Sequence, residues 1–152
     1  MTTLMTALTA KMMTSISEVM ETMFYLPVEF GEETKAINDR MKEYKPDMAC
    51  QLKFSGDASG NITLLIPESL IGEMAENFMG TPKDELTSEH ISGTLTEILN
   101  MICGNALGKV ESKIPFELGI PEMIDESKIS DSLLFNIIQT PDAVMALNIN
   151  LD

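Results

Sequence analysis

The sequence predicts an α+β domain of two layers, in which two long helices pack on a mostly antiparallel sheet. Two segments of more than twenty residues carry apolar residues at steps of three and four, the period of one helical face. Several shorter stretches alternate between apolar and polar residues, as half-buried strands do. The elements follow the order helix and three strands twice, with a short helix between. With 152 residues, of which 44% are apolar, the chain fits a single domain over residues 1–152.

The first predicted helix runs from about Thr3 to Phe24, and Pro27 ends it. One face of this helix is apolar. Its members are Met5, Leu8, Met12, Ile16, Val19, Met20 and Met23.

Three strand-like stretches follow: VEFGE (28–32), CQLKF (50–54) and NITLLIP (61–67). The intervening SGDASGN is rich in turn-forming residues, so the second and third strands should form a hairpin. The polar stretch 35–48 is left unassigned, because a loop and a short helix both fit it.

Two further helices are predicted from their end signals. The shorter one spans about 68–79, with Pro67 at its start and Gly80 at its end. The longer one spans about 88–112, where Thr87 can cap the first turn and Glu89 favours the positive end of the helix dipole.

Three more extended stretches complete the chain, at roughly 116–124, 132–140 and 143–151. The last alternates most clearly, with five apolar residues on one face: Ala143, Met145, Leu147, Ile149 and Leu151. The repeated order of elements predicts an internal duplication of one unit, a helix plus three strands.

Composition excludes several classes of function. A formal net charge of −14 argues against binding nucleic acid, because phosphates would be repelled; it suits a basic partner, although solubility alone would explain it. No apolar run is long enough to span a membrane, and no signal peptide is recognised, so a cytoplasmic protein is expected. Cys50 and Cys103 are expected to be buried free thiols in a reducing compartment. With His90 as the sole histidine, no metal-ligand cluster of the usual spacing occurs.

The long helix carries an unusual outward face in the stretch TEILNMICGNALG. A projection at 100° per residue places Glu97 and Asn100 side by side, almost opposite the apolar face. Gly93, Gly104 and Gly108 fall on the same strip, although each glycine costs roughly 1 kcal/mol against alanine inside a helix. Two interpretations remain open. The glycines relieve crowding within the protein or mark an imperfect helix, or they let another backbone approach closely.

Such a pair suits the hydrolysis of a phosphoryl group carried by another protein. A carboxamide is no general base near neutral pH, but it can accept and donate hydrogen bonds and so hold a water molecule in place. GTPases use a carboxamide for this task. A carboxylate three residues away could pair with a lysine on the phosphorylated partner. Because no phosphate-binding loop or metal site is evident in the sequence, the substrate would have to bring both.

The run EILNMICGNAL, in this arrangement of helices and strands, resembles the CheC/CheX family of chemotaxis phosphatases, and its CheX branch most closely. FSGDASGNITLLIP is similar to the central hairpin of the family, and GIPEMI to the strand after the signature helix. The resemblance implies a CheC-like fold acting on a phosphorylated CheY-like response regulator. It assigns Asn100 to orienting the attacking water and Glu97 to holding the regulator through its active-site lysine. It also implies that Mg²⁺ resides on the regulator and that this chain carries no cofactor of its own.

Two positions depart from the family pattern. The family expects Asp or Ser where this chain has Gly93, and a proline where it has Met123, with Pro121 two positions earlier. The first departure weakens local support or partner contacts, and the second is a short shift in alignment.

The duplication aligns SEVMETM of the first helix with TEILNMI, so that Glu18 matches Glu97 and Glu21 matches Asn100. A carboxylate at the water-orienting position would repel a phosphoryl group, so one competent site is expected. The simpler interpretation of Glu18 and Glu21 is an ordinary solvated helix face.

The resemblance also implies a homodimer joined through edge strands, and the long apolar strand 143–151 is consistent with an edge that needs covering. Two alternatives to the phosphatase remain. One is a non-catalytic module that binds a response regulator, which the glycine at position 93 favours. The other is a structural dimerisation domain, which leaves the glycines on the long helix unexplained.

Overall fold

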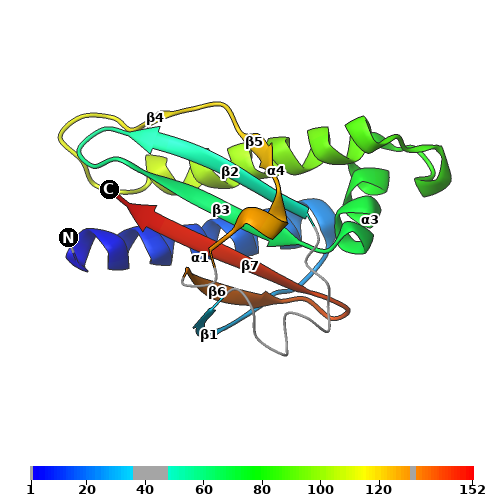
Figure 1. Ribbon diagram of the computed structural model, residues 1–152, viewed down its shortest axis with the longest axis horizontal. Coiled ribbons are helices and arrows are strands. Elements are labelled where there is room, and N and C mark those ends of the chain that lie inside the picture. The colour runs from blue at the N-terminus through cyan, green and yellow to red at the C-terminus, as the bar shows by residue number, and fades with distance from the viewer. Residues whose placement is uncertain (1, 36–47, 131–132) are drawn as a thin grey trace.

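A seven-stranded antiparallel sheet carries three helices on one face (Figure 1), in a computed structural model that describes residues 2–35, 48–130 and 133–152. The helices are α1 (Thr2–Phe24), α3 (Glu68–Met79) and α4 (Ser88–Gly108). The predicted two-layer α+β class is therefore confirmed. The unassigned polar stretch lies largely outside the described residues.

The strands are arranged so that the two halves of the chain interleave. Across the sheet the order is β1 (Glu29–Lys35), β6 (Leu134–Gln139), β7 (Val144–Leu151), β3 (Gly60–Ile66) and β2 (Met48–Ser55). Two short strands, β4 (Glu117–Leu118) and β5 (Glu122–Ile124), both pair with the outer side of β2. The predicted hairpin is confirmed as the antiparallel pair β2–β3.

The strand order is symmetric under the predicted duplication. If β1, β2 and β3 exchange places with β4–β5, β6 and β7, the same order is obtained, counted from the opposite edge of the sheet. An internal duplication requires such an arrangement. The duplication itself stays a prediction.

The strand expected at an edge is central. β7 pairs with β6 on one side and with β3 on the other, and most of its residues are buried on both faces of the sheet. A strand that is covered on both faces carries a long, continuous run of apolar residues. Such coverage is more typical of a central strand than of an edge strand. The edges are formed instead by β1, rich in glutamate, and by the short β4 and β5.

Two other boundaries differ from the sequence prediction for local reasons. α4 ends at Gly108, four positions before the predicted end, because the Asp57 carboxylate in the β2–β3 turn accepts the backbone N–H groups of Lys113 and Ile114 and draws the chain away from the helix. The predicted strand 116–124 is interrupted at 119–121. There Gly119 donates its N–H to the Lys53 carbonyl at 2.7 Å, and Pro121 has no N–H to donate to a neighbouring strand.

The main core lies between the helices and the sheet, where apolar residues from α1, α3 and α4 meet β2, β3 and β7. Four methionines are almost fully buried, which confirms core filling for them: Met12, Met20, Met74 and Met145. Cys50 and Cys103 are buried free thiols, as predicted. Burial raises the pKa of Cys50 to about 12 and that of Cys103 further still.

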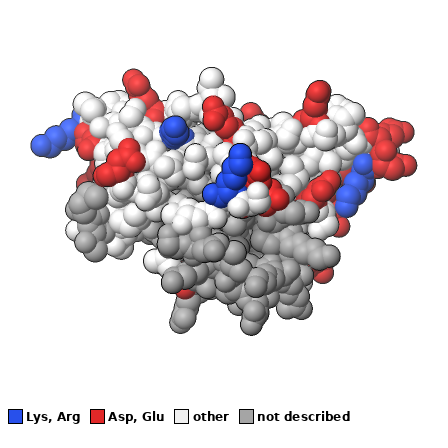
Figure 2. Space-filling model, viewed as in Figure 1, with Lys and Arg blue, Asp and Glu red and all other residues white. Residues whose placement is uncertain are grey.

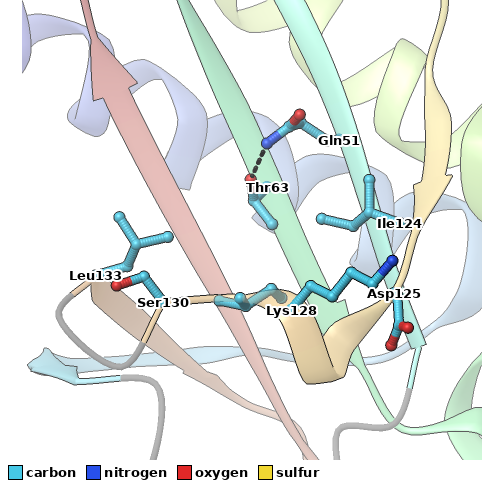
Figure 3. A pocket seen from close by; sticks show the side chains of 8 residues that line it. Gln51, Thr63, Ile124, Asp125, Lys128, Ser130 and Leu133 are labelled. Carbon is cyan, nitrogen blue, oxygen red and sulfur yellow. Dashed lines mark hydrogen bonds between the residues drawn. The ribbon is translucent and has the colours of Figure 1, made fainter.

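The opposite face of the sheet carries a smaller apolar cluster around Phe135, Leu65 and Ala146. Beside it lies a hollow of about 400 Å³ (Figure 3). Gln51 donates to the Thr63 hydroxyl at 3.1 Å in its wall, and Lys128, in the segment after β5, also lines it. On the described part of this side of the molecule, acidic and basic side chains are interspersed and no basic stripe forms (Figure 2). Within the described ranges, no helix has the length and apolar character needed to cross a bilayer.

Candidate functional site

The candidate site is the outward face of α4, a helix whose start is fixed by a reciprocal cap. The Thr87 hydroxyl accepts the backbone N–H of His90 at 3.1 Å, and His90 Nδ1 accepts the backbone N–H of Thr87 at 3.2 Å. The predicted cap at Thr87 is confirmed, and His90 acquires a structural role that the sequence did not indicate. A capped first turn holds the helix start in one conformation.

Glu97 and Asn100 lie on the side of α4 away from the core. Glu97 is exposed and Asn100 is partly buried, whereas Ile98, Leu99 and Ile102 between and beside them are buried. Neither polar side chain makes a hydrogen bond or ion pair with any residue in the described ranges. Both groups are thus available to bind something outside the chain.

The three glycines of the strip are exposed, and none relieves crowding inside the protein. A Cβ atom at Gly93 or Gly108 would meet no atom within 4 Å, and one at Gly104 would meet only Leu118 Cδ1, at an ordinary 3.6 Å. Of the two interpretations left open above, crowding within the described part of the molecule is therefore wrong. The strip is a bare helix surface, and a Cβ atom at each glycine would fit within the described part of the molecule.

A hollow of about 380 Å³ borders the C-terminal end of this strip. Its walls include Gly104 and Gly108 on one side and Phe116 and Leu118 on the other. The segment that carries the second wall is held by the Asp57 carboxylate described above and by the edge-to-face contact of Phe116 with Phe54, whose ring centroids are 5.9 Å apart. The β2–β3 turn thus shapes the margin of the site.

On α1, the carboxylate that the predicted duplication aligns with Glu97 already has partners within the chain. Glu18 accepts a hydrogen bond from Asn105 Nδ2 at 3.2 Å and pairs with Lys109 Nζ at 3.3 Å. These two partners, with Asn105 the larger cause, lower the pKa of Glu18. Glu18 is exposed, as the interpretation of an ordinary solvated face expects, and it carries a surface hydrogen bond and ion pair as well. Glu21 also lies exposed, and accepts only a long hydrogen bond of 3.4 Å from Ser17.

Sequence reasoning missed the polar contacts between α1 and α4. Ser15 is fully buried on the apolar face of α1, and Asn105 in the GNAL run donates to its hydroxyl at 3.0 Å. A serine among the apolar positions of an amphipathic helix was the available signal, because a buried hydroxyl needs a partner.

Among the side chains of the described ranges, no cluster of three or more His, Cys, Asp or Glu could hold a metal ion.

Comparison with known proteins places this geometry in context. The family model for "chemotaxis phosphatase CheX" matches residues 48–135, a segment that contains the whole of α4. No curated protein sequence matches the chain.

Several solved structures share the fold, and three of them illustrate the similarity. CheX from Vibrio vulnificus is 18% identical, with a TM-score of 0.75 over 95% of this chain and 96% of that one. CheX from Desulfovibrio desulfuricans is 16% identical, with a TM-score of 0.71 over 95% and 99%. CheX in the CheX–CheY–BeF₃–Mg²⁺ complex from Borrelia burgdorferi is 21% identical, with a TM-score of 0.74 over 93% and 96%.

Proposed function

The chain belongs to the CheX family of chemotaxis phosphatases, and from this premise we propose that it hydrolyses the aspartyl phosphate of a CheY-like response regulator. The observation that carries the proposal is the pair Glu97 and Asn100 on the outward face of α4, which has no partner in the described ranges and lies among glycines that relieve no crowding there. The Borrelia burgdorferi protein of the same fold, which forms a complex with CheY, BeF₃ and Mg²⁺, supports a regulator as partner.

Asn100 orients the attacking water. Its side-chain oxygen accepts a hydrogen bond from the water and its NH₂ group donates one, which together fix the water in line with phosphorus. The new bond forms between water oxygen and phosphorus while the bond from phosphorus to the aspartyl oxygen breaks. Inorganic phosphate leaves and the aspartate carboxylate is regenerated. The rate acceleration comes mainly from positioning the water, because phosphoryl transfer requires little covalent participation by the protein.

Glu97 anchors the regulator by pairing with a lysine of its active site. The pair is a charge-assisted hydrogen bond, and it forms as the complex excludes water, where such bonds are strongest. The phosphorylated aspartate and its Mg²⁺ both belong to the regulator as substrate.

The glycines at 93, 104 and 108 let the regulator come close to the backbone of α4. A side chain at any of them would stand between the two surfaces and hold Asn100 away from the phosphoryl group. We also expect a homodimer joined through sheet edges, with β1 and the β4–β5 side as the edges on offer, and a cytoplasmic location.

The proposal is tested by timing loss of phosphate from phosphorylated regulators mixed with the purified protein. The wild-type chain should accelerate that loss, and Asn100→Ala should reduce the acceleration on the order of 100-fold or more, the usual effect of removing one preorganised hydrogen-bonding group. Asn100→Asp should be equally inactive, because its charge repels the phosphoryl group. Both variants should still bind the regulator.

Asn150→Ala is the matched control, since Asn150 is an exposed asparagine on β7, far along the chain from α4 and without a side-chain partner in the described ranges. It should leave turnover unchanged. A wild-type chain that binds a regulator without hastening its dephosphorylation would favour the non-catalytic binding module, the alternative suggested by glycine at position 93.

A further inference from the structure

A polar network crosses the otherwise apolar interface between α1 and α4. Ser15 Oγ donates a hydrogen bond of 2.9 Å to the backbone carbonyl of Ile102, two residues after Asn100. Asn105 Nδ2 donates to Ser15 Oγ at 3.0 Å and to Glu18 Oε2 at 3.2 Å, and Lys109 pairs with Glu18 at the exposed end. The network thus runs from solvent to the fully buried Ser15 and ends on the backbone of α4.

The apolar residues of the main core around this network adapt more readily than hydrogen bonds to a small rotation of α4 about its own axis. They include Met12 and Met20 on α1, flexible side chains that can follow small movements of a neighbour. Hydrogen bonds, by contrast, depend on both distance and angle. At the outer radius of a helix, about 6 Å, a rotation of roughly 10° moves a side chain by about 1 Å.

We propose that Ser15 and Asn105 are positioning residues, which fix the rotation of α4 and therefore the direction in which Asn100 presents its amide. This inference rests on the proposed phosphatase function. In-line attack tolerates little displacement, and a misplacement of 1 Å can cost about 100-fold in rate. Docking depends less on rotation, because the flexible side chain of Glu97 can follow a small displacement of its backbone.

The network divides into an essential and a dispensable part. Ser15 and Asn105 make the contacts that reach the buried backbone, whereas the Glu18–Lys109 pair leaves side chains 53% and 40% exposed. An exposed ion pair contributes little, because water and salt screen it. Glu18→Gln keeps an acceptor for Asn105 while removing the ion pair, so it separates the two parts.

The rotation of α4 can be measured without any activity. Residual dipolar couplings of backbone N–H groups vary periodically along a helix, and the phase of that variation reports rotation about the helix axis. In the full chain, Ser15→Ala and Asn105→Ala should shift the phase for α4 by about 10° or more, beyond the tolerance of a preorganised site. Ile16→Val, which trims the neighbouring buried residue without touching a hydrogen bond, should leave the phase unchanged, as should Glu18→Gln.

Turnover and binding provide the second measurement. Ser15→Ala should lower kcat by about tenfold or more, while KM and the Kd for regulator loaded with beryllium fluoride and Mg²⁺ change less than about threefold. Ile16→Val and Glu18→Gln should keep wild-type kcat. If Asn105→Ala does not fold, Ser15→Ala decides the matter alone. In that variant the Ile102 carbonyl lies within α4 and can still accept a hydrogen bond of the helix, and Asn105 keeps Glu18 as its acceptor, so the variant should fold.

The inference is overturned by an unchanged phase in Ser15→Ala, by a shifted phase with unchanged kcat, or by an equal shift in the Ile16→Val control. A wild-type chain without phosphatase activity would instead refute the proposed function. The dipolar couplings would still decide whether Ser15 and Asn105 set the direction of Asn100.

Discussion

At the scale of single residues, the two glutamates that the predicted duplication aligns have different surroundings. Glu18 on α1 is held by Asn105 and Lys109, whereas Glu97 on α4 has no partner in the described ranges. The charge of Glu18 is already partly compensated by a lysine of its own chain, whereas the charge of Glu97 is not. Of the two, Glu97 is the group free to bind the lysine of a regulator.

Replacing Glu97 with alanine should therefore weaken docking as well as turnover. Loss of a hydrogen bond between charged groups costs about 1.5–3 kcal/mol, so the Kd for the activated regulator should rise roughly 10- to 100-fold. Titration calorimetry with regulator carrying beryllium fluoride and Mg²⁺ measures this change directly.

Glu73→Ala provides the matched control, because it removes the same charge from an exposed position on the neighbouring helix α3. It should not alter affinity. An unchanged affinity in Glu97→Ala would refute the pairing with lysine.

The sequence predicted the outward placement of Glu97 and Asn100, because a projection at 100° per residue needs only the local helix. It could not predict that Glu18 is engaged, since Lys109 lies 91 positions later in the chain. Which side chains meet across two helices depends on their rotation and depth of packing. Neither of these is encoded in the periodicity of one segment.

At the scale of elements, α4 has a low intrinsic helix propensity and presents a surface that the regulator is proposed to approach closely. Its exposed glycines lower its helix propensity, and a Cβ atom at Gly93 has open space around it. Gly93→Ala should therefore stabilise the protein by about 0.5–1 kcal/mol, measured by urea denaturation. The same methyl group should weaken regulator binding by about 1–3 kcal/mol, the usual cost of overpacking an interface.

Asn77→Ala serves as the comparison, because it raises helix propensity at an exposed position of α3, outside the strip. It should change affinity little. If Gly93→Ala stabilises the fold without weakening binding, close approach at this position is not what the glycine serves.

Element boundaries were predictable where the chain carries its own stop signals. α3 spans Glu68–Met79 as predicted, because Pro67 begins it and Gly80, with a φ of 66°, ends it in the left-handed conformation that glycine favours. The end of α4 depends instead on Asp57, a residue in a distant turn. The central position of β7 depends on which strands surround it. In both cases the determining residues lie outside the element itself.

At the scale of the whole molecule, the main core buries both cysteines. Because burial raises both thiol pKa values, to about 12 for Cys50, each should stay protonated and shielded at pH 8. Ellman's reagent should find essentially no reactive thiol in the native chain and both in denaturant. Rapid reaction without denaturant would show that the core opens locally rather than as one unit.

The reaction of the Cys50→Ala variant with Ellman's reagent reports on Cys103 alone, since this variant has no other thiol. Its thiol should be released at the same urea concentration that unfolds the helices, as followed by circular dichroism. An earlier release would place Cys103 in a part of α4 that opens separately from the rest of the fold.

The fold class was predictable because periodicity, turn residues and helix caps all indicated the same layers. The strand order was not, since alternation reveals which face of a strand is buried and gives no information on its neighbours. Interleaving of the two halves brings β1 beside β6 and β5 beside β2. Pairings of this kind are a property of the assembled molecule.

The position of β7 has a consequence for biosynthesis. β7 follows every other strand in the chain and yet lies in the middle of the sheet, between β6 and β3. During translation, the earlier strands therefore leave the ribosome without the partner that joins them. Until residues 144–151 emerge, β3 and β6 present unpaired edges that invite association with other nascent chains.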